Sequence, residues 1–574
     1  YLLFLHPERH PKVRWPVALG AATGAVMLGL LISAVQVFPF YEYIPWSPRA
    51  AEGPSRGWEY ATSWSFAPLE LATTVLPQFN GVLEHYWGSN PFKMHTEYLG
   101  ALVVALAALA WGGAGAPPRR LLWAFTAIGG LLLLVSFAAH TPFYRLWYEV
   151  MPFMKNVRAA GMAFFIPAFV VCIFAAFGLD RVLRRDLSAR QLVVPLGILA
   201  GVALLGVLGV LQAVAEGLAE PGRLPAALAN ADELRLGSVR LMVVMLAGGL
   251  VLFAIRGGSL RGLPAALAVA LVLTGDLWSV NQAFLSYKPR AEITFAEDDI
   301  TLRIKEAPLP YRVWNPAGRY SGLQVYPPSW LMAYQIPTLL GYHGNELRTF
   351  DDLLGGKNDW PHQVSPAMWD LFAVRYILLP EPQPIPGYTM VLGPARTILG
   401  REGYLYEADS IPPYVRVMAG ALKVPEVEAL QAATDPRFPL MNIALYSDTT
   451  SVAPAELGEA LPSPATVAAT LVEWNPGKMR VSLDGSDSRP TYLVVAENWY
   501  PDWQATVDGE PVAVHRAHHT LLSVELPPGA REVVFEYVSR HHDRFKGISL
   551  TAALAACLLI IVPGIRERRR SGDA

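Results

Sequence analysis

Eight apolar stretches constrain this chain more than any other feature. A helix needs roughly 20 apolar residues to cross about 30 Å of hydrocarbon. The stretches cover residues 16–38, 98–113, 121–137, 161–179, 192–214, 239–255, 263–285 and 547–565. Only 16% of the residues are charged, whereas soluble domains carry roughly 25%. The pattern predicts a polytopic α-helical membrane protein with about eight spans, of which the second is short.

Basic residues between the stretches predict the orientation of the chain. Lys and Arg gather in the short loops on the cytoplasmic side. They occur here between alternate stretches without a break in parity, as Arg9, Lys12 and Arg14, then Arg119 and Arg120, then Arg181, Arg184, Arg185 and Arg190, then Arg256 and Arg261, and finally Arg566, Arg568, Arg569 and Arg570. We therefore expect residues 39–97, 138–160 and 286–546 outside the cytoplasm, and the basic tail 566–574 inside it.

Residues 286–546 predict a large extracytoplasmic domain in two parts. Residues 286–464 mix short apolar runs, such as 311–314 and 376–379, with helical segments such as 366–372, which is typical of an α/β region. Residues 465–546 contain about seven short β-rich segments separated by turn signals, which is typical of a β-sandwich. We expect its core to hold Trp474, Val481, Leu493 and Phe535, with Trp499 and Trp503 at a corner.

Composition excludes several classes of site. The formal net charge is −2 and no basic domain is present, so a nucleic-acid partner is not expected. Both cysteines, Cys172 and Cys557, fall in apolar stretches. The histidines of the pattern His515, His518 and His519 lack a Cys or a spaced carboxylate to complete a tetrahedral set, so no metal site is predicted. Phosphate-loop, GxSxG and HExxH motifs are absent from the sequence.

The loop 138–160 contains the clearest functional candidates. Phe143, Trp147 and Met151 recur at helical spacing, which predicts a short helix lying in the membrane interface. Lys155 and Arg158 follow at i, i+3, which predicts that they share one face of a helical turn, and they run against the positive-inside trend. Two interpretations remain open: the cations anchor the loop at lipid headgroups, or they bind a phosphate together with Arg145.

Two further features allow alternatives. The loop 39–97 is rich in Trp and Tyr, which either form an interfacial belt or line a groove for an amphiphilic substrate. Asp276 lies inside an apolar stretch with Asn281 near its outer end. An ionisable group at that depth either makes a structural hydrogen bond between helices or takes part in a proton or ion relay.

Several motifs, taken in order, resemble the YfhO family of bacterial membrane proteins. They are LLISAVQVFPFYEYIPWSPRA, YWG, EYLG, MPFMKNVRAAG, LLGYHGNELRTF, LFAVRYILLP and ENWYPDWQATVDGEPVAVHRA, and together they cover most of the chain. The last is the most specific, because it joins an Asn-Trp-Tyr-Pro-x-Trp turn to a strand and an Asp-Gly turn. The family is similar to the GT-C class of integral-membrane glycosyltransferases.

The resemblance implies sugar transfer on the outer face of the bacterial cytoplasmic membrane. The donor would be a polyprenyl-phosphate-linked sugar and the acceptor a cell-envelope glycopolymer or lipid. Arg49, Arg145, Lys155 and Arg158 would supply cations for the donor phosphate, while Glu42, Glu70 and Glu97 would bind acceptor hydroxyls or a divalent cation, or else form only surface ion pairs. The catalytic carboxylate of the class lies in the first outer loop. We expect it upstream of Tyr1, because YLLFL is typical of the end of a longer helix.

Two other functions remain compatible with the sequence. One is a non-catalytic membrane protein that supports assembly or export of a surface polymer. The other is a transporter, which is disfavoured because Asp276 is the one clear ionisable residue within an apolar stretch and paired broken helices are not evident.

Overall fold

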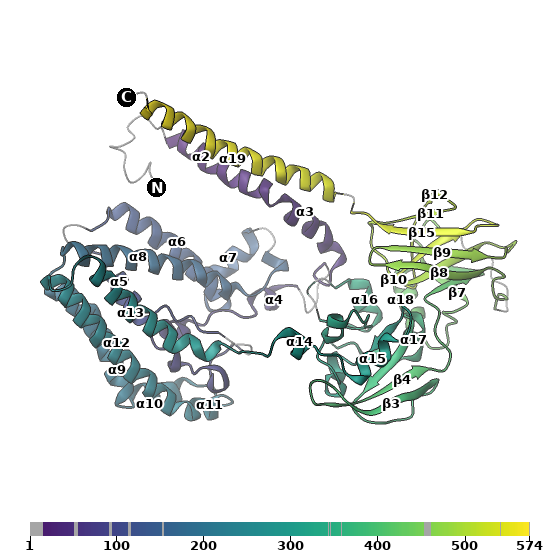
Figure 1. Cartoon of the computed structure of the whole chain (residues 1–574), viewed down its shortest axis with the longest axis horizontal. Helices are drawn as coiled ribbons and strands as arrows, with labels where there is room; N and C mark the ends of the chain where they lie inside the picture. The colour runs from purple at the N-terminus through teal and green to yellow at the C-terminus, as the bar shows by residue number, and fades with distance from the viewer. Residues whose placement is uncertain are drawn as a thin grey trace. The chain divides into compact units, whose positions relative to one another are not determined.

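The computed structural model describes residues 15–50, 56–90, 95–112, 116–151, 154–342, 344, 346–356, 359–452, 461–539 and 541–572. The predicted basic residues Arg9, Lys12 and Arg14 and the apolar residues 1–5 lie outside this range. The chain divides into two compact units (Figure 1). The first comprises Tyr1–Gly24 and Ala51–Tyr287, and the second comprises Ala25–Ala50 and Lys288–Ala574.

The first unit is a helical bundle (Figure 1). Its α-helices are α4 (Trp58–Thr62), α5 (Ala101–Ala108), α6 (Arg119–Phe137), α7 (Phe143–Val150), α8 (Phe165–Arg184), α9 (Ala189–Val207), α10 (Val210–Leu218), α11 (Leu224–Ala229), α12 (Ala231–Gly257) and α13 (Gly262–Asn281). Its short 3₁₀ helices are η2 (Pro68–Thr74), η3 (Pro77–Phe79), η4 (Leu83–His85), η5 (Ala138–His140), η6 (Met154–Asn156), η7 (Ala160–Phe164) and η8 (Gln282–Phe284).

Most of the predicted spans are present as helices. Among the described residues, six helical segments are long and apolar enough to cross a membrane: Arg119–His140, Ala160–Arg184, Ala189–Val207, Ala231–Gly257, Gly262–Phe284 and His542–Val562. The first predicted span is a pair of helices, Leu19–Ile32 and Ala34–Trp46, bent by 67°. The prediction of a spanning helix over residues 98–113 is wrong, because α5 has only 8 residues and is about 12 Å long.

Helix α5 is short because protein, rather than lipid, surrounds it. Its side chains Leu102 and Leu106 are buried against α8, α9 and α12. Gly178 of α8 permits the closest approach, since a Cβ there would lie 1.9 Å from the carbonyl oxygen of Leu106. A helix enclosed in this way does not need to match the thickness of the bilayer. The backbone N–H and C=O groups at its ends still need hydrogen-bond partners.

Two buried charges from other helices supply those partners. Asp276 of α13 accepts hydrogen bonds from the Ala101 backbone N–H, at 3.1 Å, and from the Tyr98 hydroxyl. Arg181 of α8 donates to the carbonyls of Leu109, Trp111 and Gly112 at 2.5, 3.2 and 2.6 Å. An anion thus lies at the amino end of α5 and a cation at its carboxyl end, as the helix dipole favours. Asp276 therefore makes the predicted structural hydrogen bonds, whereas Asn281 lies exposed at the end of α13.

The basic loops of the first unit meet at one end of the bundle. Arg181 binds the loop that follows α5, and Arg256 Nε donates to the Leu187 carbonyl at 3.1 Å, which joins the α12–α13 and α8–α9 loops. The loops predicted to be outside meet at the other end of α8 and α12. There the Gly57 N–H binds the Lys155 carbonyl, and Asn230 Nδ2 binds the Gln78 carbonyl at 2.7 Å. The segregation of loops follows the predicted alternation, although α5 is short.

The helices of the second unit include two long ones. They are α2 (Trp15–Ile32), which straddles the division between units, α3 (Ala34–Tyr43), α14 (Ala291–Thr294), α15 (Asp299–Lys305), α16 (Arg348–Leu353), α17 (Pro366–Leu371), α18 (Glu426–Thr434) and α19 (His542–Gly572). The 3₁₀ helices are η1 (Ile44–Trp46), η9 (Gly318–Leu323), η10 (Trp330–Tyr334) and η11 (Pro361–Val364). Helices α3 and α19 lie side by side (Figure 1), with Phe38 and Phe545 stacked at 4.6 Å.

A four-stranded sheet forms the predicted α/β region. Its strands are β1 (Arg312–Trp314), β2 (Val374–Leu379), β3 (Tyr388–Arg396) and β4 (Glu402–Ala408), in the order β1-β2-β4-β3 with β1 parallel to β2. Strand β2 is buried at five of its six residues, which explains its continuous apolar sequence. The predicted strands near 311–314 and 376–379 and the helix near 366–372 are confirmed.

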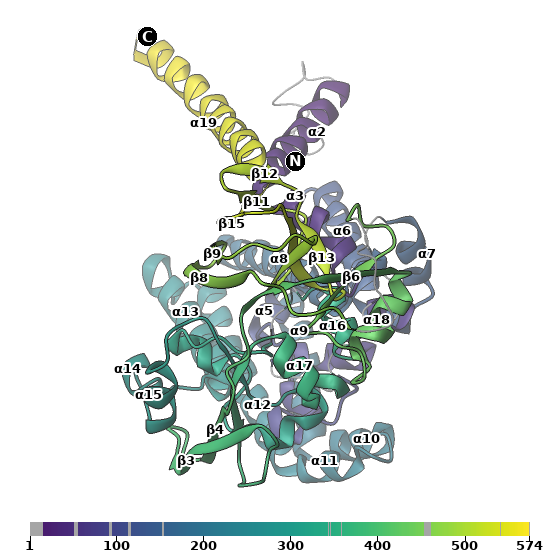
Figure 2. The same ribbon diagram turned by 90° about the vertical axis from the view of Figure 1, so that its right-hand side faces the viewer.

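Two further sheets face each other across a shared core and form the predicted β-sandwich (Figures 1 and 2). The strands are β5 (Val415–Met418), β6 (Gly420–Val424), β7 (Ile443–Ser447), β8 (Ala468–Asn475), β9 (Lys478–Asp484), β10 (Thr491–Asn498), β11 (Trp503–Val507), β12 (Glu510–Val512), β13 (His515–Ala517), β14 (Leu521–Leu526) and β15 (Glu532–Tyr537). One sheet has the order β5-β10-β14-β13-β7-β6 and the other β12-β11-β15-β9-β8.

The sandwich core agrees with the prediction, but the domain boundary does not. Val481, Leu493 and Phe535 are fully buried, and Trp474, Trp499 and Trp503 pack at the edge of the same core. The boundary at residues 464/465 is wrong, because the six-stranded sheet takes β5, β6 and β7 from the preceding region. Pairing between β5 and β10 joins segments about 75 residues apart, and local sequence patterns do not reveal such pairing.

The capping of α5 predicts a large loss of stability for Arg181→Ala. The variant leaves three carbonyls without their donor, and hydrogen bonds to charged groups contribute about 1.5–3 kcal/mol each. We expect the free energy of unfolding to fall by at least about 3 kcal/mol, measured as thermal unfolding in detergent by tryptophan fluorescence. The control is Arg184→Ala on the same helix, whose exposed pair with Asp180 should contribute less than about 1 kcal/mol. Equal melting of the two variants would contradict the capping role.

Candidate functional site

A cavity of about 490 Å³ lies within the first unit. Its lining comes from three places in the sequence: the segments around η2, the residues Asn90, His95 and Glu97, and the start of the η7–α8 helix. The polar lining includes Glu70, Asn90, His95 and Glu97, and the apolar lining includes Trp64, Phe66 and Met162. Two of the three carboxylates predicted to bind an acceptor or a cation thus line one cavity.

Glu70 is held on one side of this cavity. It is 2% exposed and belongs to η2, where Pro68 begins the helix. The Tyr86 hydroxyl donates to Glu70 Oε1 and accepts from the Asn90 backbone N–H at 3.1 Å. Burial, with the adjacent Glu70 carboxylate, raises the pKa of Tyr86 well above its usual value, so Tyr86 remains a hydrogen-bond donor. The YWG motif therefore fixes a carboxylate.

Glu97 lies on an extended segment directly before α5. Its Oε1 is 3.2 Å from His95 Nε2, and its side chain is 11% exposed whereas that of His95 is 64% exposed. The next residue, Tyr98, is bound to Asp276, so the anchor of α5 also positions Glu97. Sequence analysis did not single out His95. Its spacing of two residues from Glu97, which on an extended strand places both side chains on one side, is the signal that could have found it.

Arg158 lies beside the same cavity and stacks on an aromatic residue of its wall. Its guanidinium is 4.1 Å from the centre of the Trp64 ring and 5.4 Å from that of Tyr60. Trp64 lines the cavity, as do Ala159 and Gly161, which follow Arg158 in sequence. A guanidinium stacked on a ring keeps its N–H donors at its edge, where they can meet a phosphate. The structure thus brings Glu70, Glu97 and Arg158 together.

The other predicted cations of this loop have separate partners. Lys155 lies in η6 and pairs with Glu149 at 2.9 Å, and Arg145 stacks on Trp58 at 4.6 Å. The prediction that Lys155 and Arg158 share a helical face is wrong, because residues 157–159 are not helical. The predicted short helix is present as α7, in which Phe143 contacts Trp147. Its place in the membrane interface stays a prediction.

Unusual backbone geometry shapes the cavity wall. Trp64 and Ala159 both have left-handed φ values, 60° and 63°, although neither is glycine. Gly161 is required where the two segments touch, because a Cβ there would lie 2.7 Å from the Trp64 carbonyl oxygen. Strained residues of this kind persist where the surrounding structure holds them, and they concentrate at functional sites. This supports the cavity as a site rather than a packing gap.

Two predicted site residues belong to the second unit instead. Arg49 follows η1, and its backbone N–H binds Ser47 Oγ at 3.2 Å. Glu42 lies on α3, with its Oε1 3.5 Å from His541 Nε2. Neither lines the cavity around Glu70 and Glu97.

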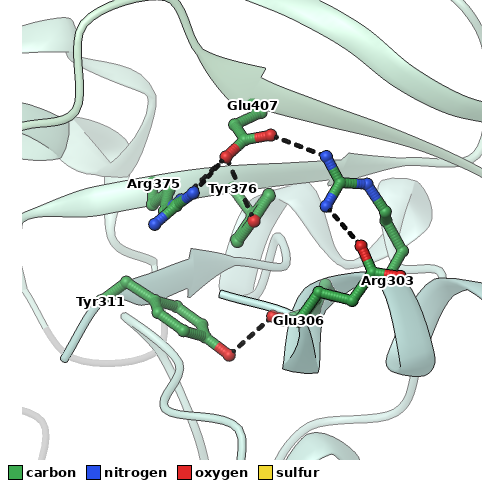
Figure 3. Close-up of polar contacts among 7 residues, drawn as sticks. Arg303, Glu306, Tyr311, Arg375, Tyr376 and Glu407 are labelled. Atoms are coloured by element: carbon green, nitrogen blue, oxygen red, sulfur yellow. Dashed lines mark hydrogen bonds and ion pairs between the residues drawn. The ribbon is translucent and has the colours of Figure 1, made fainter. Parts of the chain in front are cut away.

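The second unit contains a cluster of polar side chains that bind one another and join α15 to the four-stranded sheet (Figure 3). Glu407 of β4 pairs with Arg375 at 2.6 Å and with Arg303 at 3.1 Å, and it accepts from the Tyr376 hydroxyl. Arg303 also pairs with Glu306. Beside them, burial raises the pKa of Tyr311 to about 12, and its hydroxyl donates to the Ile304 carbonyl. The cluster ties α15 to the sheet.

The pKa values of the adjacent histidines of the HxxHH pattern, His518 and His519, are shifted in opposite directions. Burial, with the nearby Arg416, lowers the pKa of His518 to about 3. Burial also acts to lower the pKa of His519, but the carboxylates of Asp352 and Glu426 outweigh it and raise that pKa. His519 Nδ1 lies 3.1 Å from Glu426 Oε1. His519, followed by Arg516, lowers the pKa of Glu426 to about 2.

Metal ligation is not evident in the part of the chain that the structure describes, where no group of three or more His, Cys, Asp or Glu side chains is arranged to hold an ion. Comparison of the chain with protein-family models, curated proteins and solved structures finds no match in any of the three. The function is therefore argued from the geometry of the site.

Proposed function

We propose that the chain is a YfhO-like membrane glycosyltransferase of the GT-C type. It transfers a sugar from a polyprenyl-phosphate donor to a cell-envelope acceptor on the outer face of the bacterial cytoplasmic membrane. The observation that carries the proposal is the cavity that combines two carboxylates, Glu70 and Glu97, with an adjacent stacked cation, Arg158. Sugar hydroxyls are met by carboxylate and amide groups, and a phosphate by a guanidinium.

The rim of the cavity suits an amphiphilic donor. Met162 lines the cavity and is 76% exposed. Phe165 and Phe169, at i+3 and i+7 from Met162, continue the exposed apolar stripe along a helix of spanning length. A stripe of this kind on a membrane helix faces lipid. A polyprenyl chain can lie along it while the phosphate remains beside Arg158 and the sugar enters the cavity.

The proposal requires the cavity and the sheets of the second unit to lie outside. After Cys172 and Cys557 are replaced by Ser, a membrane-impermeant maleimide on intact cells should label Thr470→Cys, which is exposed on β8. It should not label Ser259→Cys, which is exposed in the basic α12–α13 loop. Positive charge in that loop supports the assignment. The opposite labelling pattern would reverse the orientation and exclude an outer-face reaction.

A non-catalytic role in polymer assembly or export is the second candidate. Its support is that two of the buried charges of the first unit, Asp276 and Arg181, hold the ends of α5. The same observation disfavours a transporter, whose intramembrane charges serve ions or substrate. Sugar transfer by the purified protein distinguishes the first two functions.

Glu97→Gln should abolish or strongly reduce sugar transfer. The change keeps the size of the side chain and removes the negative charge that faces His95, so acceptor binding or activation should fall by roughly tenfold to thousandfold. The assay follows radiolabelled sugar from a polyprenyl-phosphate donor to envelope glycopolymer with full-length protein in proteoliposomes. Glu59→Gln is the control, because Glu59 is exposed on α4 in the same loop. Equal transfer by the two variants would remove Glu97 from the site.

Arg158→Ala should weaken use of the donor without unfolding the protein. Loss of a charge-assisted contact to phosphate costs on the order of 1.5–3 kcal/mol, or roughly tenfold to hundredfold in donor dependence. Arg158→Lys should recover only part of this, since lysine cannot form a bidentate contact. Transfer rates are measured against donor concentration at a saturating acceptor concentration. An unchanged donor dependence, with normal thermal unfolding, would leave Arg158 as a headgroup anchor.

A further inference from the structure

A second cavity, of about 660 Å³, lies at the edge of the five-stranded sheet formed by β11 and β12 in the second unit. Its lining includes Trp46, Trp499 and Trp503, together with Gln504, Thr506 and Glu536. Ala505 and Val507 of β11, and Val533 and Phe535 of β15, point into the sandwich core. Because strand side chains alternate, Gln504, Thr506 and Glu536 point away from the core, whereas Trp503 is on the side of Ala505 and packs against the core. The cavity therefore reaches both kinds of side chain around the edge of the sheet. We call this cavity the tryptophan groove.

The aromatic walls of the tryptophan groove are held in place. The rings of Trp46 and Trp499 meet edge to face at 5.3 Å, and Trp499 Nε1 donates to the Val514 carbonyl at 3.4 Å. Trp503 meets Tyr537 edge to face at 5.6 Å. Each of the three indoles is therefore fixed before any ligand arrives, which lowers the entropic cost of binding.

The polar side chains of the groove, Gln504, Thr506 and Glu536, lie next to one another on β11 and β15. Gln504 and Glu536 are direct neighbours across the β11–β15 ladder, and Thr506 is two residues further along β11. An amide, a hydroxyl and a carboxylate together offer both donors and acceptors. A carboxylate accepts hydrogen bonds from hydroxyl groups but repels phosphate and uronate groups. The volume lies in the range of small-molecule sites, roughly 300–1,000 Å³.

We propose that the tryptophan groove binds a neutral oligosaccharide of hexose or N-acetylhexosamine units. A sugar ring has an apolar C–H face, which stacks on an indole, and hydroxyls at its rim, which meet Gln504, Thr506 and Glu536. This pairing of fixed indoles with a polar floor is the chemistry that a glycan presents. The groove goes beyond the proposed sugar transfer and does not depend on it, since an assembly protein would also hold a glycan.

An aromatic anchor at the membrane surface is the competing role for the same tryptophans. Trp46 follows α3, and Tyr537 precedes α19, so both lie close in sequence to long apolar helices. Trp and Tyr are enriched at such positions. An anchor has no need for Gln504 and Glu536 beside one another, whereas a glycan site does. Variants of these two residues therefore separate the roles.

The test uses full-length protein in detergent micelles on an array of immobilised neutral hexose, N-acetylhexosamine, uronate-containing and phosphate-containing oligosaccharides. We expect binding to neutral glycans, weakened roughly tenfold or more in the double variant Gln504→Ala/Glu536→Gln. Both residues are exposed, so folding should survive, and Thr506→Ala gives a second, single-site variant. The matched control is Thr470→Ala, exposed on β8 at the other edge of the same sheet.

Four outcomes would overturn the proposal. They are the absence of binding to every glycan on the array, preference for the anionic glycans, equal binding by the double variant and the Thr470→Ala control, and a tryptophan fluorescence response to phosphatidylglycerol vesicles but not to glycans. The readout is binding rather than transfer. Failure of this proposal is therefore distinguishable from failure of the proposed enzyme.

Discussion

The capping of α5 by two buried charges is the constraint on which the first unit depends. A helix of 8 residues among longer ones leaves end groups that its neighbours partly cover, and these groups need hydrogen-bond partners. Asp276 of α13 and Arg181 of α8 bind these end groups. The two contacts fix the position of α5 along its axis relative to α13 and α8. Removing Asp276 would take an acceptor from the Ala101 N–H and the Tyr98 hydroxyl. Removing Arg181 would take the donor from the carbonyls of the loop after α5. The arrangement accounts for Asp276, the ionisable residue that hydropathy marks as an anomaly, and gives Arg181 of the basic loop a structural role.

The same anchor extends to the candidate site. Asp276 binds Tyr98 as well as the start of α5, and Glu97 precedes Tyr98 on the extended segment that enters the cavity. Glu70 is held independently, by Tyr86 of the YWG motif. The two carboxylates therefore take their positions from different parts of the bundle. Sites built on rigid supports in this way keep their geometry when substrate binds.

Sequence patterns predicted the parts of this fold that depend on local order. Hydropathy located most of the spans, and alternating side chains located the strands β8 to β15, although β12 and β13 had appeared as one segment and belong to different sheets. Sequence patterns did not predict features that depend on contacts between segments far apart in the sequence. Residues 98–113 are apolar enough for a span, yet α5 is short because α8, α9 and α12 enclose it. Arg158 was identified from its charge, but its partners Tyr60 and Trp64 lie about 95 residues earlier, and spacing suggested Lys155 instead.

The cations of the loop 138–160 differ in the type of side chain that holds them, and this determines how much positive charge the loop keeps. Lys155 is paired with Glu149, so its charge is largely offset. Arg145 and Arg158 are held by aromatic rings, which attract a cation without carrying a net charge of their own. The loop therefore keeps most of the positive charge of both guanidiniums while their positions are fixed. An ion pair would fix an arginine equally well but would weaken its attraction for phosphate. Aromatic support is thus the arrangement that holds the Arg158 guanidinium in place without cancelling its charge.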